Sequence, residues 1–309
     1  MKTFLSDEGL SEVIGFILLI GILVIFLVMY QTYSVPVQGR DDEIGHMNDI
    51  KNTFVVYKIS LDSLWINSRE GTTLSTTLDL GTGGGYSQGG TGDIALLKPL
   101  SSGGSVGINQ RSETITVTAT TFASGGDVTV VLADYETGSL EFQSDNNYWI
   151  DQNYYYQLGG VFLEQETGST VRVMPPLTIA RYGTNAGYTA KVDFTIIRLN
   201  GEQLISGRGP VRIDTNLNTK GISESPNYKG IKNITITVGS DNPETLLMWN
   251  DLFRGSLARY GIPAEWYTLT STDDEVSLNI IGNSTLGVYA DIVRANYTAT
   301  LQTVATGIE

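Results

Sequence analysis

The chain has 309 residues, and its 33 acidic and 19 basic side chains give a net charge of −14, which argues against a nucleic-acid-binding surface. It has no cysteine, which excludes disulfide bonds, thiolate metal sites and cysteine nucleophiles. Its single histidine, His46, leaves little room for imidazole chemistry, and no cofactor is expected. With 41% hydrophobic and 17% charged residues, most of the chain should fold.

An apolar segment lies close to the amino terminus. Every residue from Val13 to Met29 is apolar or glycine, without a single charge. A helix of this length spans about 25 Å, so the next few residues should complete a membrane crossing. A buried core helix would show a polar face. A secretory signal would have a basic start and a small-residue cleavage site, whereas Asp7, Glu8 and Glu12 precede this run and no A-x-A pattern follows it. We therefore predict a transmembrane helix over residues 10–35 with the lipid bilayer as its partner. Its first and last apolar turns contain Val13, Ile14, Gly15, Phe16, Met29 and Tyr30.

The residues that begin this segment carry a family resemblance. Gly9, followed by Leu10 and the block Ser-Glu-Val-Ile-Gly, resembles the amino-terminal segment of archaeal type IV pilin-like proteins with a class III signal peptide. The resemblance covers about the first 70 residues. It implies that a prepilin peptidase removes residues 1–9 as a leader, that Leu10 becomes the first residue, and that the helix is retained. It also implies possible assembly as a homo-oligomer or with other pilin-like subunits. Acidic Asp7 and Glu8 stand where family leaders usually carry Lys or Arg.

Charges on either side of the segment indicate its orientation. Lys2 precedes the helix, whereas Arg40 after it is followed at once by three acidic residues. The positive-inside rule then favours a cytoplasmic amino terminus and an exterior carboxy-terminal domain. Three N-glycosylation sequons, at Asn233, Asn283 and Asn296, lie in that domain, where an exterior location would expose them to modification.

A second, amphipathic helix is expected over residues 36–70. Apolar residues recur every three or four positions from Ile44 to Leu64, which predicts one apolar stripe. The stripe can pack on the body of its own chain or on the same helix of a neighbour, and we expect the former. Pro36 should kink or break the chain between the two helices. The residues expected to face water are Asp41, Asp42, Glu43, Asn48, Asp49, Lys51 and Lys58.

Residues 71–309 alternate between apolar and polar positions in short runs, which predicts an antiparallel β-sandwich. The expected strands are 113–120, 127–133, 190–199, 231–238, 276–281 and 288–303. Ser124-Gly125-Gly126 and Asn200-Gly201 are typical of hairpin turns. One inserted helix should begin at Asn242-Pro243 and end before Gly261. The predicted fold class is therefore α+β.

Motifs with possible chemistry are few. Ser105 lies in a G-x-S-x-G pattern, but a glycine- and serine-rich loop is expected there and the only histidine lies upstream, so a chance match is favoured. The glycine-rich run 81–92 lacks the ending of a phosphate loop. Asp145, Asn147 and Asp151 are weak candidates for a calcium site, and residues 273–275 are acidic as well. Tyr148, Trp149 and the run 154–156 could form a stacking platform, although aromatic residues in strands more often form the core.

These features favour a structural or adhesive surface protein, anchored by one helix and without a catalytic motif. Two alternatives remain open. One is a membrane-tethered hydrolase that uses Asp or Glu, which would need two carboxyl groups with raised pKa values in one concave site. The other is a glycan- or calcium-dependent binding module on a permanent anchor.

Overall fold

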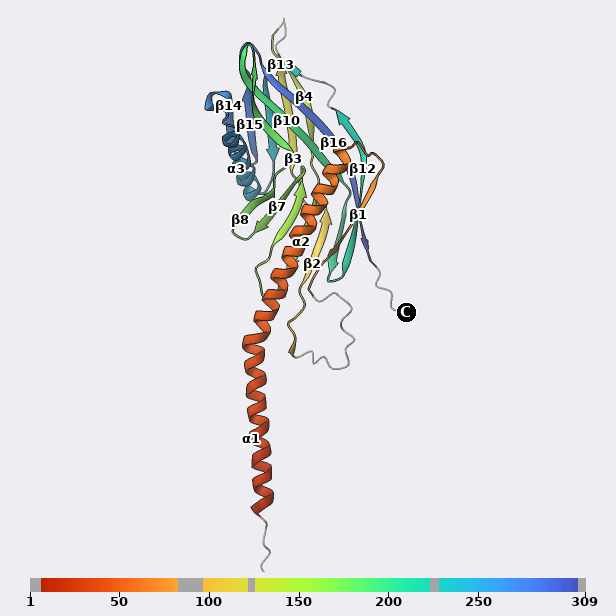
Figure 1. Ribbon diagram of the computed structural model, residues 1–309, viewed down its shortest axis with the longest axis vertical. Helices are drawn as coiled ribbons and strands as arrows, with labels where there is room; N and C mark the ends of the chain where they lie inside the picture. The colour runs from red at the N-terminus through yellow and green to blue at the C-terminus, as the bar shows by residue number, and fades with distance from the viewer. Residues whose placement is uncertain (1–6, 83–96, 122–125, 223–227, 305–309) are drawn as a thin grey trace, which may run out of the picture.

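The computed structural model describes residues 7–82, 97–121, 126–222 and 228–304, and its fold is α+β. A long amino-terminal helical rod carries a β-rich body at its far end (Figure 1). The rod consists of α1 (Asp7–Met29), the π-helical turn η1 (Tyr30–Ser34) and α2 (Val35–Ile66). The body contains two sheets built mainly of antiparallel strand pairs and the later helix α3 (Pro243–Arg259), with the short 3-10 turn η3 (Ala264–Trp266) after it.

The first sheet has ten strands, and β10 and β16 are a parallel pair within it. Its strands are β1 (Thr73–Asp79), β3 (Thr114–Thr121), β4 (Val128–Glu136), β9 (Leu177–Thr184), β10 (Gly187–Asn200), β12 (Pro210–Ile222), β13 (Tyr228–Gly239), β14 (Tyr267–Ser271), β15 (Glu275–Ile281) and β16 (Val288–Thr303). The second sheet follows the order β11-β2-β5-β6-β7-β8. Its strands are β2 (Gly103–Ile108), β5 (Ser139–Asp145), β6 (Asn153–Gln157), β7 (Gly160–Gln165), β8 (Gly168–Val173) and β11 (Gln203–Gly207).

The rod bends at Pro36 but does not break. Proline has no N–H with which to bond the carbonyl of Thr32, and the wider turn η1 ends two residues before Pro36. The Thr32 hydroxyl also donates to the Val28 carbonyl at 2.8 Å, a contact that favours bending. Figure 1 shows the change of direction where α1 passes into α2. Of the two outcomes predicted from the sequence, the kink is the one that forms.

The apolar stripe of α2 packs on its own chain, as we expected. Six of its residues are at least nine-tenths buried, in one core that contains residues of both sheets: Met47, Ile50, Phe54, Tyr57, Leu61 and Leu64. Two buried hydrogen bonds fix the contact: the Tyr57 hydroxyl lies 2.9 Å from the Thr215 hydroxyl, and the Tyr297 hydroxyl donates to the Leu61 carbonyl at 2.7 Å. The upper half of the rod is therefore part of the body.

Two polar residues of α2 that should face water are buried. Lys58 is 7% exposed and pairs with Asp62 one turn further along the helix. Glu43 is 1% exposed and accepts hydrogen bonds from the loop between β5 and β6. Periodicity predicted which face carries the apolar stripe but not its width. The buried face of a helix can extend beyond its apolar residues when the polar residues at its edges have hydrogen-bond or ion-pair partners.

The second sheet separates two cores, because its alternate side chains face opposite ways. Tyr154 and Tyr156 of β6 face the core that contains α2, whereas Tyr155 faces the core that contains α3. Helix α3 begins as the sequence predicted, with the Asn242 side chain accepting the Glu244 N–H at 3.0 Å. Gly261 follows it with a positive φ of 59°.

Two local predictions were wrong. Asn200-Gly201 is not a hairpin, because β10 belongs to the first sheet while β11 pairs with β2 in the second. The turn carries the chain from one sheet to the other. The stretch around Ser105, expected as a loop, is strand β2. The other predicted hairpin does join paired strands, β3 and β4, although part of its turn lies outside the described residues.

Candidate functional site

The three weak metal candidates do not converge on one point. The Asn147 side chain donates to the Ser101 carbonyl at 3.2 Å, and an Asp151 carboxylate oxygen accepts the Asn146 N–H at 3.0 Å. Asp145 lies at the end of β5, beside a recess of about 360 Å³ that Arg208 also lines. In the part of the chain that the structure describes, no group of three acidic or histidine side chains could hold a metal ion.

The loop that holds Asn147 instead encloses the carboxylate of Glu43. This carboxylate accepts three successive backbone N–H groups: Asn147 at 2.7 Å, Tyr148 at 2.9 Å and Trp149 at 2.6 Å. We call this arrangement the Glu43 clasp. Hydrogen bonds to an ionised acceptor are stronger than neutral ones, particularly away from water. The clasp therefore ties α2 to the second sheet at the point where the rod enters the body.

Two aromatic contacts surround the clasp. The Tyr148 ring lies against Gly39, where an added Cβ atom would be 2.3 Å from the ring. The guanidinium of Arg40 lies 4.4 Å from the centre of the Trp149 ring. Together with the burial of residues 154–156, these contacts show that the predicted stacking platform consists mainly of packing residues.

The other motifs have no supporting geometry. Ser105 lies within β2, and the chain continues into β3 without the helix that a nucleophile elbow requires. His46 is held at 2.9 Å from the Asp79 carbonyl and edge-on to Phe142. The glycine-rich run 81–92 lies almost entirely outside the described residues.

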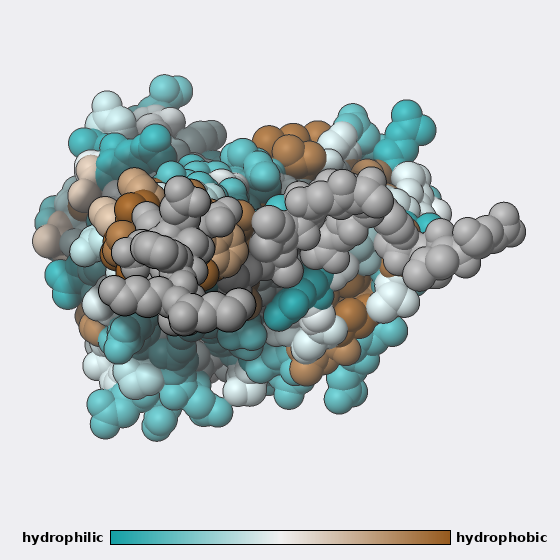
Figure 2. All heavy atoms as spheres, turned by 90° about the horizontal axis from the view of Figure 1, so that it is seen from below, coloured by the Kyte–Doolittle hydropathy of each residue, from teal (hydrophilic) through white to brown (hydrophobic). Residues whose placement is uncertain are grey.

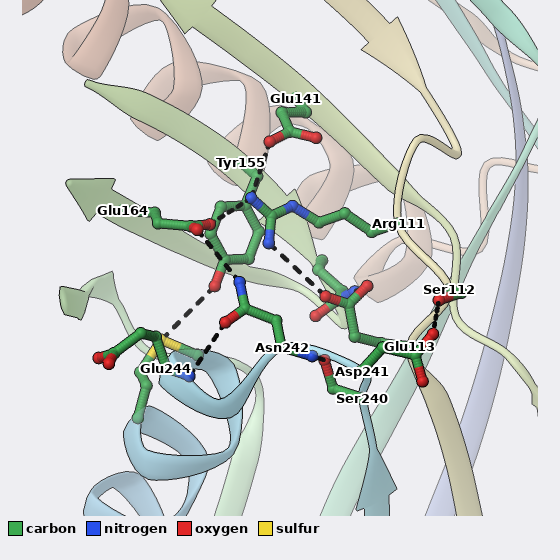
Figure 3. A network of polar contacts seen from close by, with 12 residues as sticks. Arg111, Ser112, Glu113, Glu141, Tyr155, Glu164, Ser240, Asp241, Asn242 and Glu244 are labelled. Carbon is green, nitrogen blue, oxygen red and sulfur yellow. Dashed lines mark hydrogen bonds and ion pairs between the residues drawn. The ribbon is translucent and has the colours of Figure 1, made fainter. Parts of the chain in front are cut away.

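Sequence reasoning missed one gathering of charges, which we call the Arg111 cluster (Figure 3). Arg111 precedes β3, and its guanidinium contacts Glu141 of β5 at 2.7 Å, Glu164 of β7, and Glu113 at 3.6 Å. The same guanidinium lies 3.9 Å from the centre of the Tyr155 ring. Its three carboxylate partners come from three separate parts of the chain, so no local pattern could have revealed the cluster.

Amide side chains complete the Arg111 cluster. Asn242, the N-cap of α3, donates to Glu164 at 3.1 Å, and Gln157 donates to Glu113 at 2.8 Å. Burial raises the pKa of the Glu113 carboxyl, although the charge of Arg111 and the bond from Gln157 oppose this effect. A recess of about 330 Å³ adjoins the cluster and is lined by polar side chains. Because Arg111 engages all three carboxylates, the arrangement joins strands and helix rather than presenting a free acid and base.

The surface of α1 differs from that of the body. All the large apolar side chains from Val13 to Phe26 are at least 44% exposed, and none of the most apolar window is buried. Figure 2 looks at the molecule from the free end of the rod, where apolar residues are visible, whereas most residues at the rim of the body are hydrophilic. Helix α1 is long and apolar enough to cross a membrane. The peptide bond between Gly9 and Leu10 lies in its first turns.

The three sequons lie in different settings. Asn233 is within β13 and donates to Asn279 at 3.0 Å, and Asn296 is within β16 and donates to Thr219 at 3.2 Å. Asn283 lies in the turn between β15 and β16, where its side-chain oxygen accepts the Thr285 N–H at 2.8 Å. All three residues are half-buried.

Comparisons with known proteins found no matching family model, no matching curated protein and no matching solved structure.

Proposed function

We propose that the protein is a single-pass, membrane-anchored surface protein whose β-rich body acts structurally or adhesively outside the cell. The observation that carries the proposal is the bare apolar surface of α1, from Val13 to Met29, at the end of a rod whose other half is built into the body. Transfer of such side chains from water to a bilayer is favourable by about 0.3–0.6 kcal/mol for each Leu, Ile, Phe or Val near the centre.

The rod is suited to hold the body in a defined position. Helix α2 continues α1 without a loop, and the Glu43 clasp fixes it to the second sheet. Tyr33, 70% exposed, lies about one turn beyond α1, where an interfacial aromatic ring would stand at the edge of the bilayer. The charge pattern supports a cytoplasmic amino terminus and an exterior body.

The finer part of the proposal is pilin-like processing and assembly. The match from Gly9 to Gly15 supports cleavage by a prepilin peptidase, and the bare surface of α1 offers a face for packing on pilin-like subunits. We propose no catalytic reaction, because the three carboxylates of the Arg111 cluster, those of Glu113, Glu141 and Glu164, are all paired with Arg111.

Replacing Val24 and Ile25 with arginine tests the anchor. Each arginine near the bilayer centre costs about 2.5–3.5 kcal/mol, so the double variant should lose membrane retention in a flotation assay. Val56 and Ile59 are matched controls, because they are 58% and 60% exposed on α2. Their arginine variants should stay with the membrane. Full retention of the Val24→Arg, Ile25→Arg protein would contradict the anchor.

Processing is tested separately by mass spectrometry of the protein from native membranes. An amino terminus at Leu10 supports the pilin-like part, whereas an intact Met1 refutes it without affecting the anchor. Electron microscopy of cells that express the protein then distinguishes filaments from isolated subunits.

A further inference from the structure

Two tyrosine rings meet on a face of the first sheet although their strands are not neighbours. Tyr182 is on β9 and Tyr289 on β16, with β10 between them. Their ring centres are 4.9 Å apart, with 50° between the ring planes. Thr189 of β10, opposite Tyr182, is only 1% exposed. Two aromatic side chains therefore reach toward each other across β10, and Tyr182 remains 41% exposed.

Charged side chains lie beside the rings on the same face. Lys191 of β10 is opposite Tyr289, and its ammonium lies 2.7 Å from the carboxylate of Asp193. Asp291 of β16 is opposite Asp193 and exposed. The hydrogen bond from Lys191 to Asp193 raises the pKa of that lysine, so it remains a charged donor. We call this group the tyrosine shelf. Its members are Tyr182, Lys191, Asp193, Tyr289 and Asp291.

The described residues leave this part of the sheet partly exposed: Tyr182 is 41% exposed, and the side chains of Lys191 and Asp193 are each 39% exposed. Further along β10 and β16, side chains of the same face are buried in the core with α2, for example Leu199, Ala295 and Tyr297. Helix α2 ends at Ile66, and Figure 1 shows both strands continuing beyond it, at the end of the body farthest from α1. Beyond the end of α2, the side chains on this face of β10 and β16 are no longer aliphatic but include tyrosine, lysine and aspartate. Tyrosine is enriched in interaction surfaces, so the paired rings are the feature of this face that points to a partner.

We infer that the tyrosine shelf binds the pyranose rings of a neutral carbohydrate. Aromatic rings offer an apolar face to the C–H groups on one side of a sugar, while nearby charged groups bond its hydroxyls. The shelf has two acceptor carboxylates and one donor ammonium, so its net negative charge disfavours acidic polysaccharides. A second copy of the chain would bring the same negative charge against it. The inference deepens the proposed function by naming the partner of the exterior body.

The test uses the full-length protein in detergent, so that it does not depend on membrane retention or orientation. Neutral mannose and N-acetylglucosamine oligosaccharides are titrated and followed by saturation-transfer NMR and calorimetry. Tyr182→Ala and Tyr289→Ala should each weaken binding up to about tenfold, because an aromatic contact contributes about 0.5–1.5 kcal/mol. Tyr182→Phe should retain most of the binding. Tyr260→Ala is the matched control, since Tyr260 is 40% exposed at the end of α3.

Binding that falls in both tyrosine variants but not in the Tyr260 variant supports the inference. Three results would overturn it: no binding of either sugar at millimolar concentration, equal binding by all variants, or self-association of the protein that the tyrosine substitutions abolish. Circular dichroism verifies that each variant is folded. An anchor that fails the flotation test leaves these measurements valid, so the two proposals can fail separately.

Discussion

The Glu43 clasp makes a prediction that can be worked out from the structure. In Glu43→Ala, the N–H groups of Asn147, Tyr148 and Trp149 lose the carboxylate that accepts them. Glu43 is 1% exposed, so water does not readily replace it. A hydrogen bond to a charged group contributes about 1.5–3 kcal/mol, and the three bonds share one carboxylate, so their contributions are not additive. We expect a loss of about 4 kcal/mol in the free energy of unfolding.

The assay is thermal unfolding of the full-length protein in detergent, with hydrogen exchange read by mass spectrometry. A domain of this size loses about 2–4 °C in Tm for each kcal/mol, so the melting temperature should fall by about 10 °C. Exchange should accelerate in the loop 146–151. Asp42→Ala is the matched control, because Asp42 is the exposed acidic neighbour of Glu43. A Glu43→Ala protein that melts like the control and keeps its loop protected would refute the proposed role of the clasp.

Three further predictions concern single positions. In Gly39→Leu, the new side chain meets the Tyr148 ring, so the melting temperature should fall while Gly45→Leu, with open space around it, melts like the native protein. Asn242→Ala removes the N-cap of α3 and a bond to Glu164, and should cost about 1–2 kcal/mol in urea unfolding. Because burial raises the pKa of Glu113, this residue contributes stability at low pH that is lost as the pH rises through its folded pKa. The difference in free energy of unfolding between Glu113→Gln and the native protein should therefore shift in favour of the variant as the pH rises from 4 to 7. A difference that stays constant over this range would contradict the raised pKa of Glu113.

The sequence predicted the elements whose signals are local. Strand β16 is found at Val288–Thr303, as the alternation indicated, and α3 begins and ends where its capping residues are. The Arg111 cluster could not be predicted, because Arg111 and Glu164 lie 53 positions apart in the chain and meet only through the pairing of the second sheet. Glu43 was misplaced for a related reason. Its position on the helix is polar by pattern, and its burial depends on a loop 104 positions later.

A few residues at the start of α2 make the first contacts between the rod and the body, before the buried stripe from Met47 to Leu64. The Glu43 clasp, the contact of Gly39 with Tyr148 and the stacking of Arg40 on Trp149 all lie within five residues of the helix. The bend at η1 lies just before them, so the rod changes direction before it becomes fixed to the second sheet. Any tilt of α1 in a bilayer would then be transmitted through the bend to the whole body, including the tyrosine shelf at its far end.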